Sequence, residues 1–241
     1  MDDRARPTVG RAPAGRRRAV GRGLLFAAAP IALWYAVLVG IGIALGGPLA
    51  EMVEGTEDGL ASTLDSSRTP RWDAVSQAVS VTANTMAIVA TALVLGLVLR
   101  VVVGRWLESF VLWAGVAIQS TVFLLTTLVV SRDRPDVEQL DPAPPTSSFP
   151  SGHTGAAAAL YLGLAAVLAG RTRRPWLRFV VVAVLVLVPL AVGLSRLYRG
   201  MHHPTDVAFG LLNGIVAVSI ARFATVGGAR VKRPTRRAPP P

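Results

Sequence analysis

The sequence predicts an all-α fold, a bundle of six transmembrane helices. Hydrophobic residues make up 52% of the chain and charged residues only 16%, and the mean hydropathy is +0.50, which is typical of membrane proteins. Six apolar stretches approach or exceed the roughly 20 residues that cross a bilayer. Their apolarity is continuous and does not alternate with period two, which favours helices over barrel strands.

The predicted helices follow one another with polar connections between them. Arginines precede the first helix, but its apolar stretch is longer than the about 7–15 residues of a signal-peptide core, so we expect it to be retained. The last three helices are short for a full span, so we expect their polar ends to lie at interfacial depth. No repeat of about 20–50 residues is visible, which predicts one membrane domain, 23–223, between basic tails, 1–22 and 224–241. The six helices are predicted at residues 23–46, 76–99, 109–130, 154–170, 179–195 and 204–221.

Basic residues concentrate on one side of the predicted bundle. That side holds 19 basic and 3 acidic residues, and the other side holds 6 basic and 11 acidic residues. Because basic residues next to membrane helices stay in the cytoplasm, we expect both termini to be cytoplasmic. The net charge of +11 then reflects topology and contacts of the tails with anionic lipids, and we expect no nucleic-acid partner. The segments expected on the outer face are 47–75, 131–153 and 196–203.

The segment FPSGHTG, residues 149–155, stands at the start of the fourth predicted helix. Unpaired N–H groups and the positive dipole end at a helix start suit a phosphate group. Gly152 lets an anion approach the backbone closely, and Ser151 adds a hydroxyl donor. Taken alone, the segment is better explained as a simple helix cap with an interfacial His153.

The segment SRLYRGMHHPTD, residues 195–206, precedes the sixth predicted helix. Asp206 falls in the first helical turn, from where its carboxylate can accept the N–H of His202 and fix the tautomer of that ring. An oriented imidazole is a candidate nucleophile or base. Arg196 and Arg199 supply permanent positive charge for an anion.

A metal site is the alternative interpretation of this segment, since His202, His203 and Asp206 are all metal-binding residue types. Two adjacent side chains rarely converge on one ion, and neighbouring arginines would repel it, so we expect no metal. We expect His203 to cap the helix or to pack. Cysteine is absent, which excludes disulfides and thiolate metal sites.

A third polar segment surrounds Arg134 and Pro135, which are expected to end the third helix on the outer face. An arginine at a helix end is often only an interfacial anchor. Beside two other segments that suit anions, phosphate binding is the better account of Arg134. All three segments are predicted on one face, as a composite site requires.

Together, the three segments resemble the signature motifs of the type-2 phosphatidic acid phosphatase family, relatives of the vanadium-dependent haloperoxidases. The motif PSGH is intact at residues 150–153, and SRxxxxxHxxxD is intact at residues 195–206. The motif KxxxxxxRP retains only Arg134 and Pro135, with Thr127 at the lysine position. The resemblance extends in order over residues 127–206, and six helices match the membrane branch of the family.

The resemblance implies a phosphohistidine mechanism without a metal or organic cofactor. His202 would attack phosphorus, Asp206 would orient it, and His153 would protonate the leaving oxygen. The phosphoryl oxygens would be held by Arg134, Arg196, Ser151 and the backbone of Gly152. If the third helix continues to Arg134, positions 127 and 134 share a face; Arg132 could replace the missing lysine only if the helix has unwound by then.

The implied function is that of a cell-membrane lipid phosphate or diphosphate phosphatase, with its active site at the outer membrane–water interface. Candidate substrates are undecaprenyl and other polyprenyl diphosphates, phosphatidic acid and phosphatidylglycerol phosphate. Two alternatives remain open: a phosphotransferase that passes the phosphoryl group to another lipid, and a non-catalytic protein that binds or transports lipid phosphates.

Overall fold

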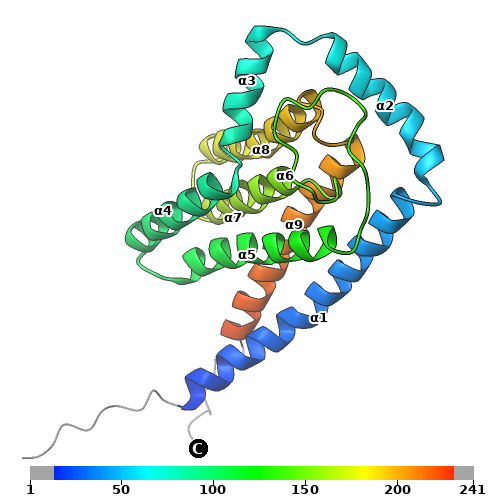
Figure 1. Cartoon of the computed structure of the whole chain (residues 1–241). Helices are drawn as coiled ribbons and strands as arrows, with labels where there is room; N and C mark the ends of the chain where they lie inside the picture. Colours follow the sequence, from blue (N-terminus) through cyan, green and yellow to red (C-terminus); the bar gives the residue numbers. More distant parts are fainter. Residues whose placement is uncertain (1–13, 231–241) are drawn as a thin grey trace, which may run out of the picture.

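The computed structural model describes the backbone of residues 14–230 and the side chains of residues 27–225. In this part of the chain the regular elements are all helical, as the sequence predicts (Figure 1). Within these described residues, six helical stretches are long and apolar enough to cross a membrane. The elements are α1 (Ala14–Leu45), α2 (Ala50–Ser66), α3 (Pro70–Val81), α4 (Thr85–Val103), α5 (Leu107–Thr127), α6 (Gly152–Ala157), the π-helical turn η1 (Ala158–Leu162), α7 (Gly163–Ala169), α8 (Pro175–Tyr198) and α9 (Pro204–Arg230).

The second predicted span has the wrong boundaries. The range 76–99 covers the end of α3, a turn, and most of α4. The turn is set by Asn84, whose side chain accepts a hydrogen bond from the N–H of Ala87 at 2.8 Å and so starts a new helix. The segment expected to be an outer connection, 47–75, contains α2 and the first half of α3, which the hydropathy pattern did not reveal.

The third predicted helix ends earlier than expected. Helix α5 stops at Thr127, so the chain is no longer helical when it reaches Arg134, and positions 127 and 134 share no helical face. The hydroxyl of Thr126 donates to the carbonyl oxygen of Val122, and that of Thr127 donates to the carbonyl oxygen of Leu124, each at 2.8 Å. The condition under which Arg132 could turn towards the site is therefore met.

The last two spans are longer than predicted. Helix α8 has 24 residues, about 36 Å, and the apolar part of α9 has 22 residues. Only the fourth span, formed by α6, η1 and α7 together, is as short as expected, with 18 residues. Residues 14–22 belong to α1 and residues 224–230 to α9, whereas the rest of the two predicted tails lies outside the described residues.

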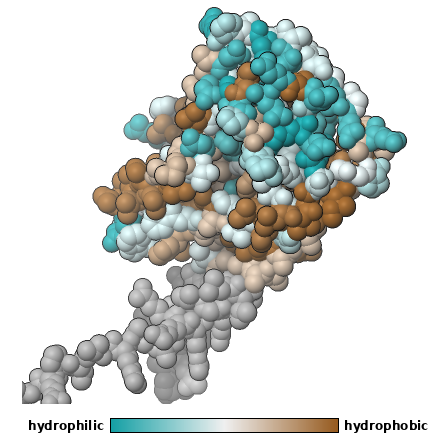
Figure 2. All heavy atoms as spheres, in the orientation of Figure 1, coloured by the Kyte–Doolittle hydropathy of each residue, from teal (hydrophilic) through white to brown (hydrophobic). Residues whose placement is uncertain are grey.

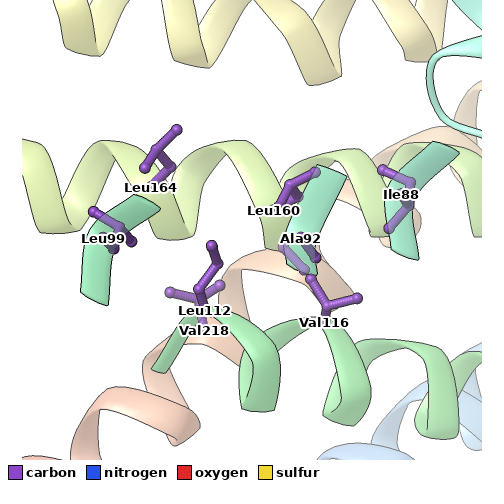
Figure 3. Packing of buried hydrophobic residues seen from close by; sticks show 9 residues of the cluster. Ile88, Ala92, Leu99, Leu112, Val116, Leu160, Leu164 and Val218 are labelled. Atoms are coloured by element: carbon purple, nitrogen blue, oxygen red, sulfur yellow. The ribbon is translucent and has the colours of Figure 1, made fainter. Parts of the chain in front are cut away.

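Buried aliphatic side chains from five helical elements, α4, α5, η1, α7 and α9, form the centre of the bundle (Figure 3). In this cluster Leu112 and Leu160 are completely buried. Close packing of this kind holds membrane helices together, since lipid is as apolar as the side chains themselves. The members are Ile88, Ala92, Leu99, Leu112, Val116, Ala159, Leu160, Leu164 and Val218.

Helices α6 and α9 approach each other closely at two glycines. A Cβ on Gly210 would lie 2.6 Å from the carbonyl oxygen of Ser151, and one on Gly155 would lie 3.0 Å from the carbonyl oxygen of Gly210. The contact at Gly210 excludes a side chain there, and a side chain at Gly155 would require the neighbouring backbone to shift. The crossing places the PSGH segment against the first turns of α9.

The outer surface of the bundle is apolar where lipid is expected. Large hydrophobic side chains such as Val101, Phe179 and Leu194 are exposed on α4 and α8. Figure 2 shows a band of hydrophobic residues, whereas hydrophilic residues gather where Figure 1 has α2, α3 and the loop before α6. A soluble protein would not expose so much apolar surface, so the chain is a multi-pass membrane protein.

Candidate active site

All eight residues predicted for the site lie at one end of the bundle, in the loop between α5 and α6 with the first residues of α6, and around the loop between α8 and α9. The first of these loops folds back on itself. The N–H of Ser148 donates to the carbonyl oxygen of Arg132 at 2.9 Å, and the Ser148 hydroxyl donates to the carbonyl oxygen of Asp133 at 2.8 Å. This closure brings Arg132 next to the PSGH segment. The eight residues are Arg132, Arg134, Ser151, Gly152, His153, Arg196, His202 and Asp206.

The second loop joins α8 to α9 and carries His202. It turns at Gly200, which has a φ of 68°. The N–H of Ser151 donates to the carbonyl oxygen of Asp206 at 2.9 Å, so the two intact motifs are in direct contact. The structure thus brings the segments at residues 150–153 and 195–206 together, and that they form one site stays a prediction.

The imidazole of His202 is buried and held by a backbone carbonyl. Its Nδ1 lies 2.8 Å from the carbonyl oxygen of Ser148. Because a carbonyl oxygen can only accept, Nδ1 carries the proton, and the lone pair of the neutral ring lies on Nε2. Burial lowers the pKa of the His202 imidazole and outweighs the opposing attraction of Asp206, which keeps the ring neutral.

Asp206 does not form the hydrogen bond to His202 that the sequence suggested. Its Oδ2 lies 3.8 Å from Nδ1 of His202, which is too far for a hydrogen bond, and accepts instead from the N–H of His203 at 2.8 Å. In this contact the Asp206 carboxylate caps the start of α9, whereas His203 contributes only its backbone N–H, so its expected capping by the side chain is not seen. Asp206 therefore acts on His202 through its charge, and Ser148 supplies the direct contact.

A line of buried charges holds the Asp206 carboxylate in place. Oδ1 of Asp206 pairs with one terminal guanidinium nitrogen of Arg132 at 2.5 Å, and the other terminal nitrogen pairs with Oε2 of Glu57 at 2.6 Å. Oε1 of Glu57 accepts from the N–H of Thr205 at 2.9 Å. The side chains of all three charged residues are at most 6% exposed. Both terminal nitrogens of Arg132 are thus committed to carboxylates, which favours a positioning role over phosphate binding.

Glu57 is a site residue that the motifs did not reveal. It lies on α2 within a stripe of less exposed residues that continues through Val53, Ala61 and Leu64. These positions are four, four and three residues apart, as on one face of a helix. An acidic residue inside such a stripe is the sequence signal that could have identified Glu57.

A second group of charges surrounds Asp141, which sequence analysis also missed. Arg199 binds this carboxylate through two nitrogens, at 2.9 and 2.7 Å, and Arg196 binds it through one, at 2.5 Å. Burial alone would raise the pKa of the Asp141 carboxyl, but the hydrogen bonds and charges of the two arginines hold it below its ordinary value. Asp141 therefore stays ionised and anchors the loop before α6 to the end of α8.

Arg199 and Arg196 differ in whether a guanidinium nitrogen is left to bind a ligand. Arg199 makes further hydrogen bonds to the carbonyl oxygen of Leu140 and to the hydroxyl of Ser76, which indicates a structural role. Arg196 also donates to the Ser80 hydroxyl at 2.6 Å, yet its Nε is buried with no hydrogen-bond partner among the described residues. An unsatisfied buried donor of this kind is suited to an anion.

Arg134 and the start of α6 complete the arrangement. One terminal nitrogen of Arg134 donates to the carbonyl oxygen of Met201 at 2.7 Å, and burial lowers the pKa of its guanidinium from the usual value. The half-buried His153 lies within range of the charges on Arg134 and Arg196. Ser151 is the N-cap residue of α6, and its hydroxyl shares a 2.9 Å hydrogen bond with that of Thr154.

Gly152 has a packing reason for lacking a side chain, besides the access to the backbone expected for an anion. A Cβ at this position would lie 2.7 Å from the ring of Phe123. Phe123 thus fixes the start of α6 against α5.

Among the described residues, no group of three or more His, Cys, Asp or Glu side chains is placed to share a metal ion.

Comparison with known proteins identifies the family. Residues 86–226 match the family model described as the PAP2 superfamily. The chain belongs to the PAP2 superfamily. This confirms the resemblance seen in the three motifs, all of which fall inside the matched region.

Two curated relatives are similar over part of the chain. Decaprenylphosphoryl-5-phosphoribose phosphatase of Mycobacterium tuberculosis is 34% identical over 127 residues, which cover 51% of this chain and 63% of that protein. Glucose-6-phosphatase 3 of Rattus norvegicus is 39% identical over 71 residues, which cover 28% of this chain and 20% of that protein. The chain thus spans less than two thirds of the length of either relative.

Two solved structures share the fold. The transmembrane PAP2 type phosphatidylglycerolphosphate phosphatase of Bacillus subtilis superposes with a TM-score of 0.66 at 20% identity, over 86% of this chain and 97% of that chain. LpxE of Aquifex aeolicus superposes with a TM-score of 0.55 at 22% identity, over 68% of this chain and 93% of that chain. At these identities the likeness establishes the architecture.

Proposed function

We propose that the protein is an integral membrane phosphatase that removes a phosphate group from a lipid through a phosphohistidine intermediate. The observation that carries the proposal is the 2.8 Å contact of His202 Nδ1 with the Ser148 carbonyl oxygen, which leaves Nε2 as the nucleophilic nitrogen. Membership of the PAP2 superfamily supports the same reaction class.

In the first step, Nε2 of His202 forms a bond to phosphorus while the bond from phosphorus to the lipid oxygen breaks. The leaving oxygen keeps the electron pair and takes a proton from His153. In the second step, His153 removes a proton from water, and the water oxygen attacks the phosphohistidine. The P–N bond breaks, inorganic phosphate leaves, and His202 returns to its neutral form.

Fixed donors stabilise the charge that spreads over the phosphoryl oxygens in both steps. The candidates are the unsatisfied Nε of Arg196, the guanidinium of Arg134, the hydroxyl of Ser151 and the N–H groups of Gly152 and His153 at the start of α6, which the Ser151 side chain does not cap. Such donors are already in position before the reaction, so the site needs little reorganisation when charge develops. The mechanism draws all its steps from side chains and assigns none to a metal or organic cofactor.

Arg132 acts in this proposal as a positioning residue. By pairing with Asp206 and Glu57 it sets the place of the carboxylate that stabilises positive charge on His202. The original expectation that Arg132 binds substrate phosphate remains a competing prediction, and the two roles differ in their kinetic signature, as described in the Discussion.

The substrate class we propose is a lipid-linked phosphomonoester or diphosphate. The relative from Mycobacterium tuberculosis is named for a phosphoribose carried on a decaprenyl lipid, and the Bacillus subtilis structure for phosphatidylglycerolphosphate. Polyprenyl phosphates and diphosphates, phosphatidic acid and phosphatidylglycerol phosphate therefore belong in a first substrate panel.

Release of phosphate by the purified protein from each lipid of the panel, in the presence of a chelator, tests this function. We expect release of inorganic phosphate from at least one lipid, and loss of that release in His202→Ala. Transfer of the phosphate to a second lipid would identify a phosphotransferase. Binding without either reaction would identify a non-catalytic protein and would contradict the proposal.

We further propose that the site faces the outside of the cell, with both termini in the cytoplasm. The support is the excess of basic residues at the other end of the bundle and in the tails. The chain has no cysteine, so Thr146→Cys in the exposed loop before α6 and Arg174→Cys at the opposite end are single reporters. An impermeant thiol reagent added to intact cells should label the first and spare the second; the reverse pattern would place the site in the cytoplasm.

A further inference from the structure

A cavity of about 540 Å³ opens at the end of the bundle opposite the candidate active site. It lies between the connection from α4 to α5, the connection from α7 to α8, and the C-terminal part of α9. Helix α5 begins at this cavity and ends near the active site after 21 residues, so the two are separated by roughly 30 Å. The cavity is therefore separate from the site described above.

The cavity is lined by four arginines and one acidic residue. Arg105 and Arg171 both donate to Oε1 of Glu108, each at 2.5 Å. Arg173 and Arg222 also line it, and their guanidinium groups have no ion-pair partner among the described residues. The cavity thus carries uncompensated positive charge on planar groups that bind phosphate oxygens in pairs.

The rest of the lining distinguishes the cavity from a merely basic surface. Val111, Ala166 and Val167 form an apolar wall on the side of the bundle core. Trp106 and Trp176 are exposed at the same end, as is typical of residues at a membrane–water interface. A ligand that fits both parts has an anionic group and an apolar portion, and its anionic group lies at headgroup depth.

Glu108 adds a third feature to the same cavity. Its Oε1 accepts from both arginines, whereas its Oε2 is buried and has no hydrogen-bond partner within the described part of the chain. An unpaired carboxylate oxygen can accept from a hydroxyl group of a ligand. A phosphate that carries a glycerol hydroxyl, as in phosphatidylglycerol, satisfies the arginines and this oxygen together.

From these features we infer that the cavity is a second anion site, which binds the phosphate group of a ligand on the side of the membrane opposite the active site. Phosphatidylglycerol and free inorganic phosphate both present this chemistry. The inference does not depend on the proposed phosphatase activity. The competing account is that these arginines only fix the topology, in which case they have no preference for one anion over another and are interchangeable with their neighbours.

The experiment compares two pairs of substitutions in the full chain, purified in neutral detergent. Arg173→Gln with Arg222→Gln removes the two unpaired arginines of the cavity. Arg174→Gln with Arg178→Gln removes the same charge from exposed positions on the same side that do not line it. Native mass spectrometry measures binding of phosphatidylglycerol, with phosphatidylcholine as the neutral comparison and inorganic phosphate as the competitor. The thermal unfolding midpoint of each variant checks that it is folded.

We expect the wild-type chain to prefer phosphatidylglycerol, and the cavity pair to weaken that binding by roughly tenfold or more, since each lost contact is a charge-assisted hydrogen bond. The control pair should change it by less than about twofold. If inorganic phosphate binds with the same dependence on the cavity pair and displaces the lipid, the site stands with free phosphate as its ligand. Equal losses in both pairs, or no loss in the cavity pair, would overturn the inference.

Discussion

The two ends of the bundle use arginine in different ways. At the active-site end, Arg132, Arg196 and Arg199 are almost completely buried, and each is paired with at least one carboxylate. At the other end, Arg105 and Arg171 share Glu108 but are themselves exposed, and Arg173 and Arg222 are exposed with no such partner among the described residues. A buried charge is costly unless it is paired, so the arginines deepest in the site are the ones most committed to holding it together. Among them, Arg132 and Arg199 have the larger share of their nitrogens paired, whereas Arg196 keeps a buried Nε without a partner among the described residues and is the one we expect to bind substrate.

The largest expected effect is the loss of activity when either histidine at the active-site end of the bundle is replaced. His202→Ala should reduce kcat/KM by on the order of 10⁴-fold or more, as for other enzymes that lose a nucleophile. His153→Ala should cost about 10²–10⁴-fold on a lipid with a poor leaving group, because it removes a general acid. An aryl phosphate, which needs little protonation on leaving, should recover much of the loss in His153→Ala and none in His202→Ala. Equal recovery in both would contradict the assigned roles, and Arg174→Gln at the far end is the control that should keep full activity.

The next effect tests whether paired arginines position the site. Glu57→Gln should lower kcat by about tenfold or more with little change in KM, because it frees Arg132 to shift Asp206 while leaving the phosphate donors in place. Glu54→Gln on the exposed face of α2 is the matched control. In a double-mutant cycle, Glu57→Gln and Arg132→Gln should be clearly non-additive.

A different outcome would favour direct phosphate binding by Arg132. In that case Arg132→Gln would raise KM strongly, and Glu57→Gln would leave both kinetic constants near those of the wild type. A fall in the thermal unfolding midpoint of Glu57→Gln with unchanged kcat would show that Glu57 stabilises the fold and does not position the site.

A smaller effect concerns pH. Because burial lowers the pKa of His202, the ring stays neutral and nucleophilic until the pH falls below the ordinary imidazole value of about 6.5. The acid limb of kcat/KM should therefore have its inflection below pH 6.5. The lowered pKa of His202 also affects stability. Below about pH 6.5 the unfolded chain binds a proton at His202 more readily than the folded chain does, so the free energy of unfolding should decrease as the pH drops. An acid limb at or above pH 6.5 would show that the folded site holds a protonated ring.

The smallest expected effect is at Thr127, the position where the family motif has lysine. Its hydroxyl donates to the carbonyl oxygen of Leu124 in its own helix. We expect Thr127→Ala to change kcat/KM by less than about threefold, in contrast to Arg134→Ala. A loss comparable to that of Arg134→Ala would mean that the hydroxyl contacts the substrate.

The sequence was sufficient to predict the helical class, the six spans and the meeting of three motif segments at one end of the bundle. Continuous apolarity and motif spacing depend only on residues that are near one another in the sequence, so they can be recognised without knowing how the helices pack. Glu57, Asp141 and the Ser148 carbonyl were not predictable in the same way. The first two acquire their roles only when α2 and the loop before α6 fold over the ends of α8 and α9, as Figure 1 shows. The third is a backbone acceptor, which every residue type offers equally.

The early end of α5 was also hidden from the hydropathy pattern. Residues 128–130 are as apolar as the helix before them, and the hydrogen bonds that accompany its end come from Thr126 and Thr127. The α3–α4 break has a similar cause, because Asn84 acts through a side-chain cap within an otherwise apolar stretch. Spans are thus easier to count than to delimit.

The central claim is that Nε2 of His202 becomes covalently phosphorylated. It is tested most directly by rapid quenching of the enzyme with a lipid labelled in its phosphate, followed by peptide mapping of the labelled site. We predict an acid-labile, base-stable phosphoryl group on His202, formed faster than steady-state turnover and absent from His202→Ala. Turnover with no labelled protein at any quench time, or with the label on another residue, would contradict the account.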